Sequence, residues 1–207
     1  DEESRKVKLD EFKDVADKLK DIKRIIITSC GTALYAGMVG EYLIEEYAKI
    51  PVEIEYASEF RYRSPIVEPG TAILSITQSG ETADTLAAIR EAKRQGAITL
   101  AIVNTVGSTI ARESDAVIYN QIGPEIGVAS TKAFMSQVSI LVLITLYLAE
   151  LRGAATGESN KKVVQELLAL PEKIRKILDH SDNIKAVAEK YARYDDFLYM
   201  GRKYTFP

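Results

Sequence analysis

Between about residue 24 and residue 152, apolar residues follow two patterns along the chain. Five short runs are rich in apolar residues, and the first of them, 24–30, is a continuous β-branched stretch that is typical of a strand buried on both faces of a parallel sheet. Between them, apolar residues recur every three or four positions, which predicts amphipathic helices. The predicted strands are 24–30, 52–56, 71–76, 98–104 and 116–120, and the predicted helices between them include 34–48, 83–95 and 108–113. The pattern predicts an α/β fold, a three-layer αβα sandwich around a five-stranded parallel sheet.

Further helical segments flank the predicted sheet. Apolar residues spaced by three and four predict a helix before the first strand, and a long apolar helix follows the last strand. The predicted divisions are an N-terminal helix (1–22), a core domain (23–152), a helical extension (153–195, with helices at 161–178 and 183–194) and a final segment (196–207).

The final segment repeats the order of residues seen at 25–35. A predicted strand at 196–200 is followed by Gly201, polar residues and a Tyr, and the first strand is likewise followed by Gly31, the polar Thr32 and then Tyr35. The repeat predicts that a second copy of the same fold begins here. Because the chain starts without Met and stops directly after this segment, we expect it to be a piece of a longer polypeptide.

Composition and charge exclude several classes of function. A net charge of −3 gives no electrostatic footprint for nucleic acid or an anionic membrane. A single Cys excludes an internal disulfide, and nothing resembles a signal peptide, so we expect a cytoplasmic protein. The longest apolar run, 138–149, is too short for a membrane span and predicts a core helix or a subunit interface. No cluster of His, Cys, Asp and Glu has metal-ligand spacing, so we expect neither metal nor cofactor.

The strongest candidate for binding chemistry is the polar turn after the third predicted strand. Thr77, Gln78, Ser79 and Thr82 offer hydroxyl and amide donors there, and the next helix begins with free backbone N–H groups. Gly80 would allow a sharp bend and the close approach of a ligand. The turn predicts a phosphate site. The alternative is that Ser79 or Thr82 only caps the helix.

A second polar turn, Cys30 to Ala33, follows the first predicted strand. If the strand order is the common 2-1-3-4-5, both turns lie at the switch point where such sheets bind ligands. Neither turn matches a G-x-G-x-x-G or P-loop motif, so the site suits one phosphate better than a dinucleotide.

Four ordered motifs carry a family resemblance. They are Ser-Cys-Gly-Thr-Ala at 29–33, Tyr-Ala-Ser-Glu-Phe-Arg-Tyr-Arg at 56–63, Thr-Gln-Ser-Gly-Glu-Thr-Ala-Asp-Thr at 77–85 and Glu-Ile-Gly-Val-Ala-Ser-Thr-Lys-Ala-Phe at 125–134. Together they resemble the sugar isomerase (SIS) fold, and more narrowly the first SIS half of the glutamine:fructose-6-phosphate amidotransferase family. The resemblance implies a transferase that makes glucosamine 6-phosphate from fructose 6-phosphate. It also implies a glutaminase domain before two SIS domains, and a homodimer.

The resemblance also implies roles for individual residues. The sugar phosphate would be held by Thr77, Gln78, Ser79 and Thr82. The sugar would be contacted by Thr32, Val128 and Ser130, with Cys30 and Gly31 shaping the wall. Ala33 stands where some family members have a Ser that reaches the phosphate. The catalytic Lys, Glu and His of the family lie in the second SIS half, so we expect this chain to bind sugar phosphate without turning it over.

Two other functions stay open: a non-catalytic SIS module that senses sugar phosphates, and a complete small SIS isomerase that acts as an oligomer. Several tempting residues have simpler structural interpretations. His180 lies at a predicted helix end, Cys30 follows a buried strand, and Glu81 and Asp84 suit the first turn of a helix. We expect Glu125 to shape its loop by hydrogen bonding, and Arg61 and Arg63 to pair with carboxylates or a partner subunit.

Overall fold

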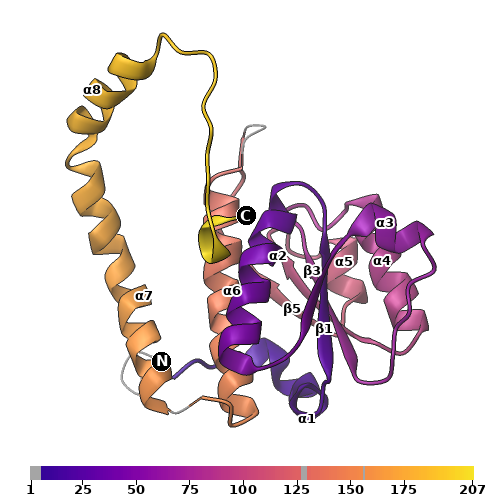
Figure 1. The fold of residues 1–207 in the computed structure, drawn as a ribbon. Helices are drawn as coiled ribbons and strands as arrows, with labels where there is room; N and C mark the ends of the chain where they lie inside the picture. The colour runs from indigo at the N-terminus through magenta and orange to yellow at the C-terminus, as the bar shows by residue number, and fades with distance from the viewer. Residues whose placement is uncertain (1–5, 127–129, 156) are drawn as a thin grey trace.

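A parallel sheet forms the centre of the computed structural model, which describes residues 6–126, 130–155 and 157–207 (Figure 1). The strands are β1 (Arg24–Ser29), β2 (Val52–Tyr56), β3 (Thr71–Ile76), β4 (Ile98–Val103) and β5 (Ala116–Tyr119), in the order β2-β1-β3-β4-β5. Every neighbouring pair is parallel, and Ser29 lies opposite Ile76, so β1 and β3 end side by side. All five predicted strands and the predicted sheet are confirmed.

Helices cover both faces of the sheet (Figure 1). One layer contains α2 (Thr32–Leu43), the π-helical turn η2 (Ile44–Ala48) and α6 (Lys132–Leu151). The other layer contains α3 (Ala57–Tyr62), α4 (Ala83–Arg94) and α5 (Thr109–Glu113). Along β1, Ile25 and Ile27 pack with the core under α2 and α6, whereas Ile26 packs with Phe60 of α3. The continuous apolar run of β1 is therefore explained by burial on both faces.

The N-terminal segment is only partly helical. Instead of the expected continuous helix over 1–22, the described part has a 3₁₀ helix, η1 (Asp10–Val15), and a short helix, α1 (Ala16–Lys20). The predicted apolar stripe is right, since Phe12, Val15 and Leu19 are all buried. The segment contacts both β5 and α6, and packing against them decides its backbone conformation more than helix propensity does.

Helix α6 is a core element. By length and composition alone it could cross a membrane. In the structure, however, Leu141 and Ile144 of this helix are fully buried in the core with the sheet and α2. The contact with α2 is close, because a Cβ added to Gly40 would lie 2.8 Å from Cδ2 of Leu141. The expected core role of the apolar helix is confirmed.

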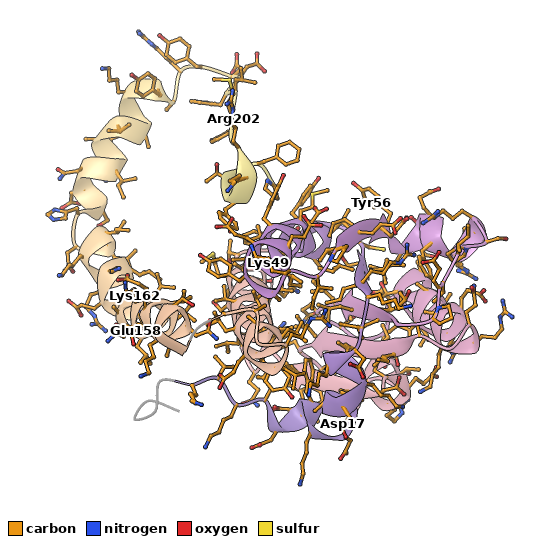
Figure 2. The ribbon with its side chains drawn as sticks, turned by 60° about the horizontal axis from the view of Figure 1, so that its bottom comes forward. Asp17, Lys49, Tyr56, Glu158, Lys162 and Arg202 are labelled. Carbon is orange, nitrogen blue, oxygen red and sulfur yellow. The ribbon has the colours of Figure 1, made fainter. Side chains whose placement is uncertain are left out.

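Two further helices lead away from the sandwich (Figures 1 and 2). They are α7 (Gly157–Leu178) and α8 (Ser181–Tyr191), close to the predicted helices. The start of α7 is anchored, because the Asn160 amide donates to the Leu146 carbonyl at 3.2 Å. From Pro171 to Phe206, in contrast, every residue is exposed. The helical extension therefore contacts the sandwich mainly through its first turns.

The expected strand at 196–200 is not formed. A strand needs a neighbour to take its backbone hydrogen bonds, and these exposed residues have no strand beside them in the described chain. The tail then returns to the sandwich through a 3₁₀ turn, η3 (Lys203–Thr205), where the Tyr204 hydroxyl donates to the Glu46 carboxylate at 2.8 Å. That hydrogen bond and burial both raise the pKa of Tyr204, with burial the larger cause.

Candidate functional site

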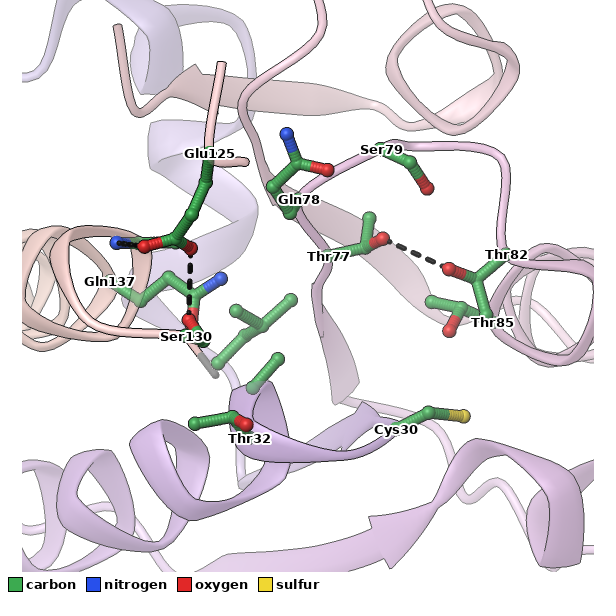
Figure 3. Close-up of a pocket in the computed structure, with 13 residues that line it drawn as sticks. Cys30, Thr32, Thr77, Gln78, Ser79, Thr82, Thr85, Glu125, Ser130 and Gln137 are labelled. Atoms are coloured by element: carbon green, nitrogen blue, oxygen red, sulfur yellow. Dashed lines mark hydrogen bonds between the residues drawn. The ribbon is translucent and has the colours of Figure 1, made fainter. Parts of the chain in front are cut away.

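A cavity of about 320 Å³ opens at the carboxyl ends of β1 and β3 (Figure 3). In the sheet, β2 lies on one side of β1 and β3 lies on the other, so the direction in which strands are added reverses at β1. The cavity is thus at the switch point of the sheet, where ligands bind in open α/β folds. Its walls consist of Cys30, Thr32, Ala33, Ile76, Thr77, Gln78, Ser79, Thr82, Thr85, Glu125, Ser130, Ala133 and Gln137.

The polar turn after β3 is held by its own side chains. The hydroxyl oxygens of Thr77 and Thr82 are hydrogen-bonded at 3.2 Å, and the backbone N–H of Gly80 donates to the Thr77 hydroxyl at 3.3 Å. Thr82 occupies the N-cap position of α4, yet its side chain makes no capping hydrogen bond. Among the described residues, no hydrogen bond is made by the N–H groups of Gln78, Ser79 and Thr82. The turn therefore leaves donors free at a helix N-terminus.

Glycine is required at position 80. Its φ is +67°, and an added Cβ would lie 2.0 Å from the Ser108 hydroxyl oxygen. The Gly80 carbonyl also accepts a hydrogen bond of 3.1 Å from the Ile110 N–H in α5. Because α5 approaches this closely, the backbone of the turn has little room to move.

Two glutamates cap neighbouring helices. Glu81 accepts a 2.7 Å hydrogen bond from the Thr109 N–H at the start of α5, and this bond is the main cause of its lowered pKa. Glu125 accepts hydrogen bonds from the Thr131 and Lys132 N–H groups, at 2.9 Å and 3.1 Å, at the start of α6. Its other oxygen accepts a 3.1 Å bond from the Ser130 hydroxyl. The expected loop-shaping role of Glu125 is confirmed, whereas Glu81 is structural in another way than expected, because it lies before α4 and bonds to α5.

Helices α2, α4, α5 and α6 therefore differ in how their N-terminal N–H groups are bonded. In the described chain, the first turns of α5 and α6 each bond to a glutamate carboxylate, whereas no side chain caps α2 or α4. Helix α2 begins after Gly31, which has a φ of +60°. Both uncapped helices start at the cavity wall, so the positive ends of two helix dipoles face the space between β1 and β3.

Most of the predicted site residues lie together in this cavity. Cys30, Thr32, Thr77, Gln78, Ser79, Thr82 and Ser130 all line it. Gly31 does not line the cavity but forms the turn between two residues that do. Val128 lies outside the described residues. The remaining tempting residues have structural partners or are remote, since Arg61 pairs with Asp84 at 3.1 Å and His180 is exposed at the junction of α7 and α8.

The sequence interpretation missed two polar lining residues, Thr85 and Gln137. Both lie inside helices, on faces that are otherwise apolar. A polar residue at the position of a buried apolar one, such as Gln137 four residues after Ala133, is the pattern that would have revealed them. Among the residues that the structure describes, no group of three His, Cys, Asp or Glu side chains could hold a metal ion.

The Glu125 cap leads to a pH-dependent prediction. Hydrogen bonds, first from the Thr131 N–H, hold the pKa of Glu125 below its ordinary value of 4.5. A lowered folded-state pKa means that the stabilisation is present above that ordinary value and is lost as pH falls through the folded pKa. Glu125→Gln should therefore lower the melting temperature at pH 7, and the difference from the parent should shrink at about pH 3.

The control is Glu11→Gln, at an exposed glutamate of η1 outside the site, which should melt with the parent at both pH values. Thermal unfolding followed by circular dichroism measures both differences. If Glu125→Gln lowers the melting temperature relative to the parent as much at pH 3 as at pH 7, a charged Glu125 does not stabilise the start of α6.

Comparison with known proteins connects this site to a family. The model of the SIS domain matches residues 18–147. The glutamine–fructose-6-phosphate aminotransferase (isomerizing) of Chlorobaculum tepidum is 50% identical over 205 residues, which are 99% of this chain and 33% of that protein. The protein of the same name from Corynebacterium glutamicum is 45% identical over 206 residues, 100% of this chain and 33% of that protein. The chain thus spans about a third of the length of these curated relatives.

Solved structures agree with this match. The C-terminal domain of glucosamine-fructose-6-phosphate aminotransferase from Francisella tularensis is 37% identical, with a TM-score of 0.91 over 97% of this chain and 56% of that chain. Glucosamine-6-phosphate deaminase from Thermotoga maritima, at 23% identity and a TM-score of 0.58 over 75% of this chain and 48% of that chain, shares the fold alone. The resemblance inferred from the four motifs is confirmed, and the chain belongs to the SIS domain family.

Proposed function

We propose that this chain is the sugar-phosphate-binding half-domain of a glutamine-dependent enzyme that makes glucosamine 6-phosphate from fructose 6-phosphate. The observation that carries the proposal is the uncapped turn Thr77 to Thr82, which lies in a cavity at the switch point of the sheet. Free N–H groups and hydroxyls at a helix N-terminus bind phosphate without any cationic side chain. We assign Thr77, Gln78, Ser79 and Thr82 to the phosphate, and Cys30, Gly31, Thr32, Val128 and Ser130 to the sugar.

The alternative, that the turn only caps a helix, is disfavoured by its hydrogen bonds. A capping Thr82 would accept a bond from its own helix, whereas its hydroxyl bonds to Thr77 instead. The Ser79 hydroxyl accepts from the Glu81 N–H at 3.2 Å, which closes the turn but leaves the first turn of α4 free. Hydrogen-bond donors that have no partner and lie beside a cavity are available to bind an anion.

The size and charge of the cavity favour a single sugar phosphate. About 320 Å³ is at the lower end of the range for small-ligand sites, and so suits one sugar better than a dinucleotide. The negative Glu125 lies on the α6 side of the cavity, opposite Thr82 (Figure 3). An anion is repelled from Glu125 and attracted to α4, so the phosphate should bind at the turn, with the sugar carbons reaching toward Ser130.

The chemical step needs groups that this cavity does not supply. Among the described lining residues, the only titratable side chains are Cys30 and Glu125, and the Glu125 carboxylate is already used to cap α6. We therefore propose that the chain binds the sugar phosphate but does not convert it, and that the catalytic groups come from the rest of a longer protein. A non-catalytic sensor would share the binding step, but the two curated relatives described above are named as aminotransferases.

We further propose that residues 23–152 form the SIS core, 153–195 a helical extension, and 196–207 the start of a second SIS domain. Support comes from the large apolar side chains that α7, α8 and the tail leave exposed, which include Leu168, Ile177, Leu178, Ile184, Val187, Phe197, Leu198 and Met200. Monomeric soluble proteins rarely expose such a continuous apolar stretch. In the parent enzyme, which we place in the cytoplasm as a homodimer with a glutaminase domain, the second SIS domain would cover it.

Ligand binding tests the phosphate assignment. Fructose 6-phosphate should raise the melting temperature of the chain, because a ligand at a hundred times its Kd stabilises the folded state by about 2.7 kcal/mol. Ser79→Ala combined with Thr82→Ala removes two donors to the phosphate, and should weaken binding at least about tenfold and reduce the shift. Differential scanning fluorimetry across a ligand series measures both effects.

The matched control combines Ser58→Ala with Thr105→Ala, which removes two hydroxyls that do not line the cavity. This variant should keep the parent's shift. If fructose 6-phosphate stabilises the Ser79 and Thr82 double variant as strongly as the parent, the phosphate assignment is wrong.

Turnover tests the division between binding and catalysis. Purified chain incubated with fructose 6-phosphate and either glutamine or ammonia should form no glucosamine 6-phosphate, because the described cavity has no amine nucleophile and its titratable side chains are only Cys30 and the Glu125 carboxylate that caps α6. Mass spectrometry of the sugar phosphates measures this directly. Product formation above an enzyme-free control would refute the proposal that the catalytic groups lie elsewhere.

A further inference from the structure

Gln137 is a buried amide without a partner. It lies in α6, is only 2% exposed and lines the cavity. Its neighbours on the same helix face, Ala133, Ile140 and Leu141, are apolar and buried. Among the described residues, none donates a hydrogen bond to the Gln137 carbonyl oxygen or accepts one from its amide nitrogen.

Other amides of this fold show that the arrangement is unusual. Gln95 uses both ends of its amide, donating to the Pro65 carbonyl at 3.1 Å and accepting from the Val67 N–H at 3.3 Å. Asn120 and Asn160 each leave one atom unpaired, but each keeps one hydrogen bond. Gln137 keeps none, yet neither of its amide atoms is among the enclosed polar atoms of the described residues, so the amide of this buried side chain is open to the cavity. A buried side chain whose unpaired amide opens only to a cavity is a candidate for function.

The position of Gln137 suits the carbon chain of the ligand rather than its phosphate. Figure 3 shows Gln137 on the side of the cavity formed by α6, with Glu125 and Ser130, opposite Thr77 and Thr82. The negative Glu125 on the same side excludes an anion there. A neutral amide both donates and accepts hydrogen bonds, and so does a sugar hydroxyl.

We propose that Gln137 determines specificity by hydrogen bonding to the hydroxyl groups of the ligand's carbon chain, so that the site distinguishes a sugar phosphate from bare phosphate. The inference rests on the proposed function, because it assumes a sugar phosphate whose phosphate group lies at the Thr77 to Thr82 turn. A ligand without hydroxyls leaves the buried amide unpaired, and sites of this kind discriminate strongly against such ligands. The absent partners of Gln137 are thus supplied by the ligand.

The test replaces the amide by an apolar group of similar length, Gln137→Met, in the full chain. Isothermal titration with fructose 6-phosphate and with inorganic phosphate gives the two affinities, and calorimetry gives the ligand-free melting temperature. We expect fructose 6-phosphate to bind about tenfold more weakly, inorganic phosphate to bind within twofold of the parent, and the melting temperature to stay equal or rise. A residue with a purely structural role would instead lower the melting temperature.

The control is Thr145→Val, which removes another buried polar group of α6 whose hydroxyl bonds to the Leu141 carbonyl at 2.7 Å, away from the cavity. It should leave both affinities unchanged. Equal fructose 6-phosphate affinity in the parent and Gln137→Met would overturn the inference, and so would an equal loss for both ligands. Failure of both Gln137→Met and Gln137→Leu to fold would also overturn it, because loss of an unpartnered amide should not unfold the chain.

The same titrations separate this inference from the proposed function. A parent chain that binds neither fructose 6-phosphate nor inorganic phosphate contradicts the proposed function and the role of Gln137 with it. A parent chain that binds fructose 6-phosphate while Gln137→Met binds it equally well contradicts the role of Gln137 alone.

Discussion

The candidate site depends on one constraint: backbone N–H groups at the start of α4 have no partner within the described chain. Such groups must be satisfied by side chains, water or a ligand. In this fold, the nearest candidate cap, Thr82, is bonded to Thr77 instead. The close contact of Gly80 with Ser108 then holds the turn in place, so it cannot relax to cover its own donors.

The surrounding elements make this constraint specific. The order of the strands places the ends of β1 and β3 together, so the uncapped starts of α2 and α4 face one cavity. Glu81 and Glu125 bond to the neighbouring helices α5 and α6, which keeps their negative charges engaged on backbone N–H groups. The cavity therefore attracts an anion at the uncapped starts of α2 and α4 and repels it at Glu125, at the start of α6.

Sequence predicted the parts of the structure that local pattern determines. The five strands are short runs rich in apolar residues, continuously β-branched in β1, and the phosphate turn is a contiguous polar stretch, so both could be identified without coordinates. Gln137 and Thr85 could not be assigned, because a polar residue within a helix reveals a site only when its surroundings are known. The predicted strand at 196–200 was wrong, since its formation depends on partner strands that the described chain lacks. The continuous N-terminal helix was wrong because tertiary packing decides the conformation there.

The central claim is that the free N–H groups of the Thr77 to Thr82 turn bind the phosphate of a sugar phosphate. The most direct test is a titration of ¹⁵N-labelled chain with fructose 6-phosphate, followed by amide chemical shifts. The account predicts that the largest changes occur at Gln78, Ser79 and Thr82, whereas Thr109, whose N–H already bonds to Glu81, changes little. Unchanged amides in the turn, in a chain that demonstrably binds the ligand, would contradict it.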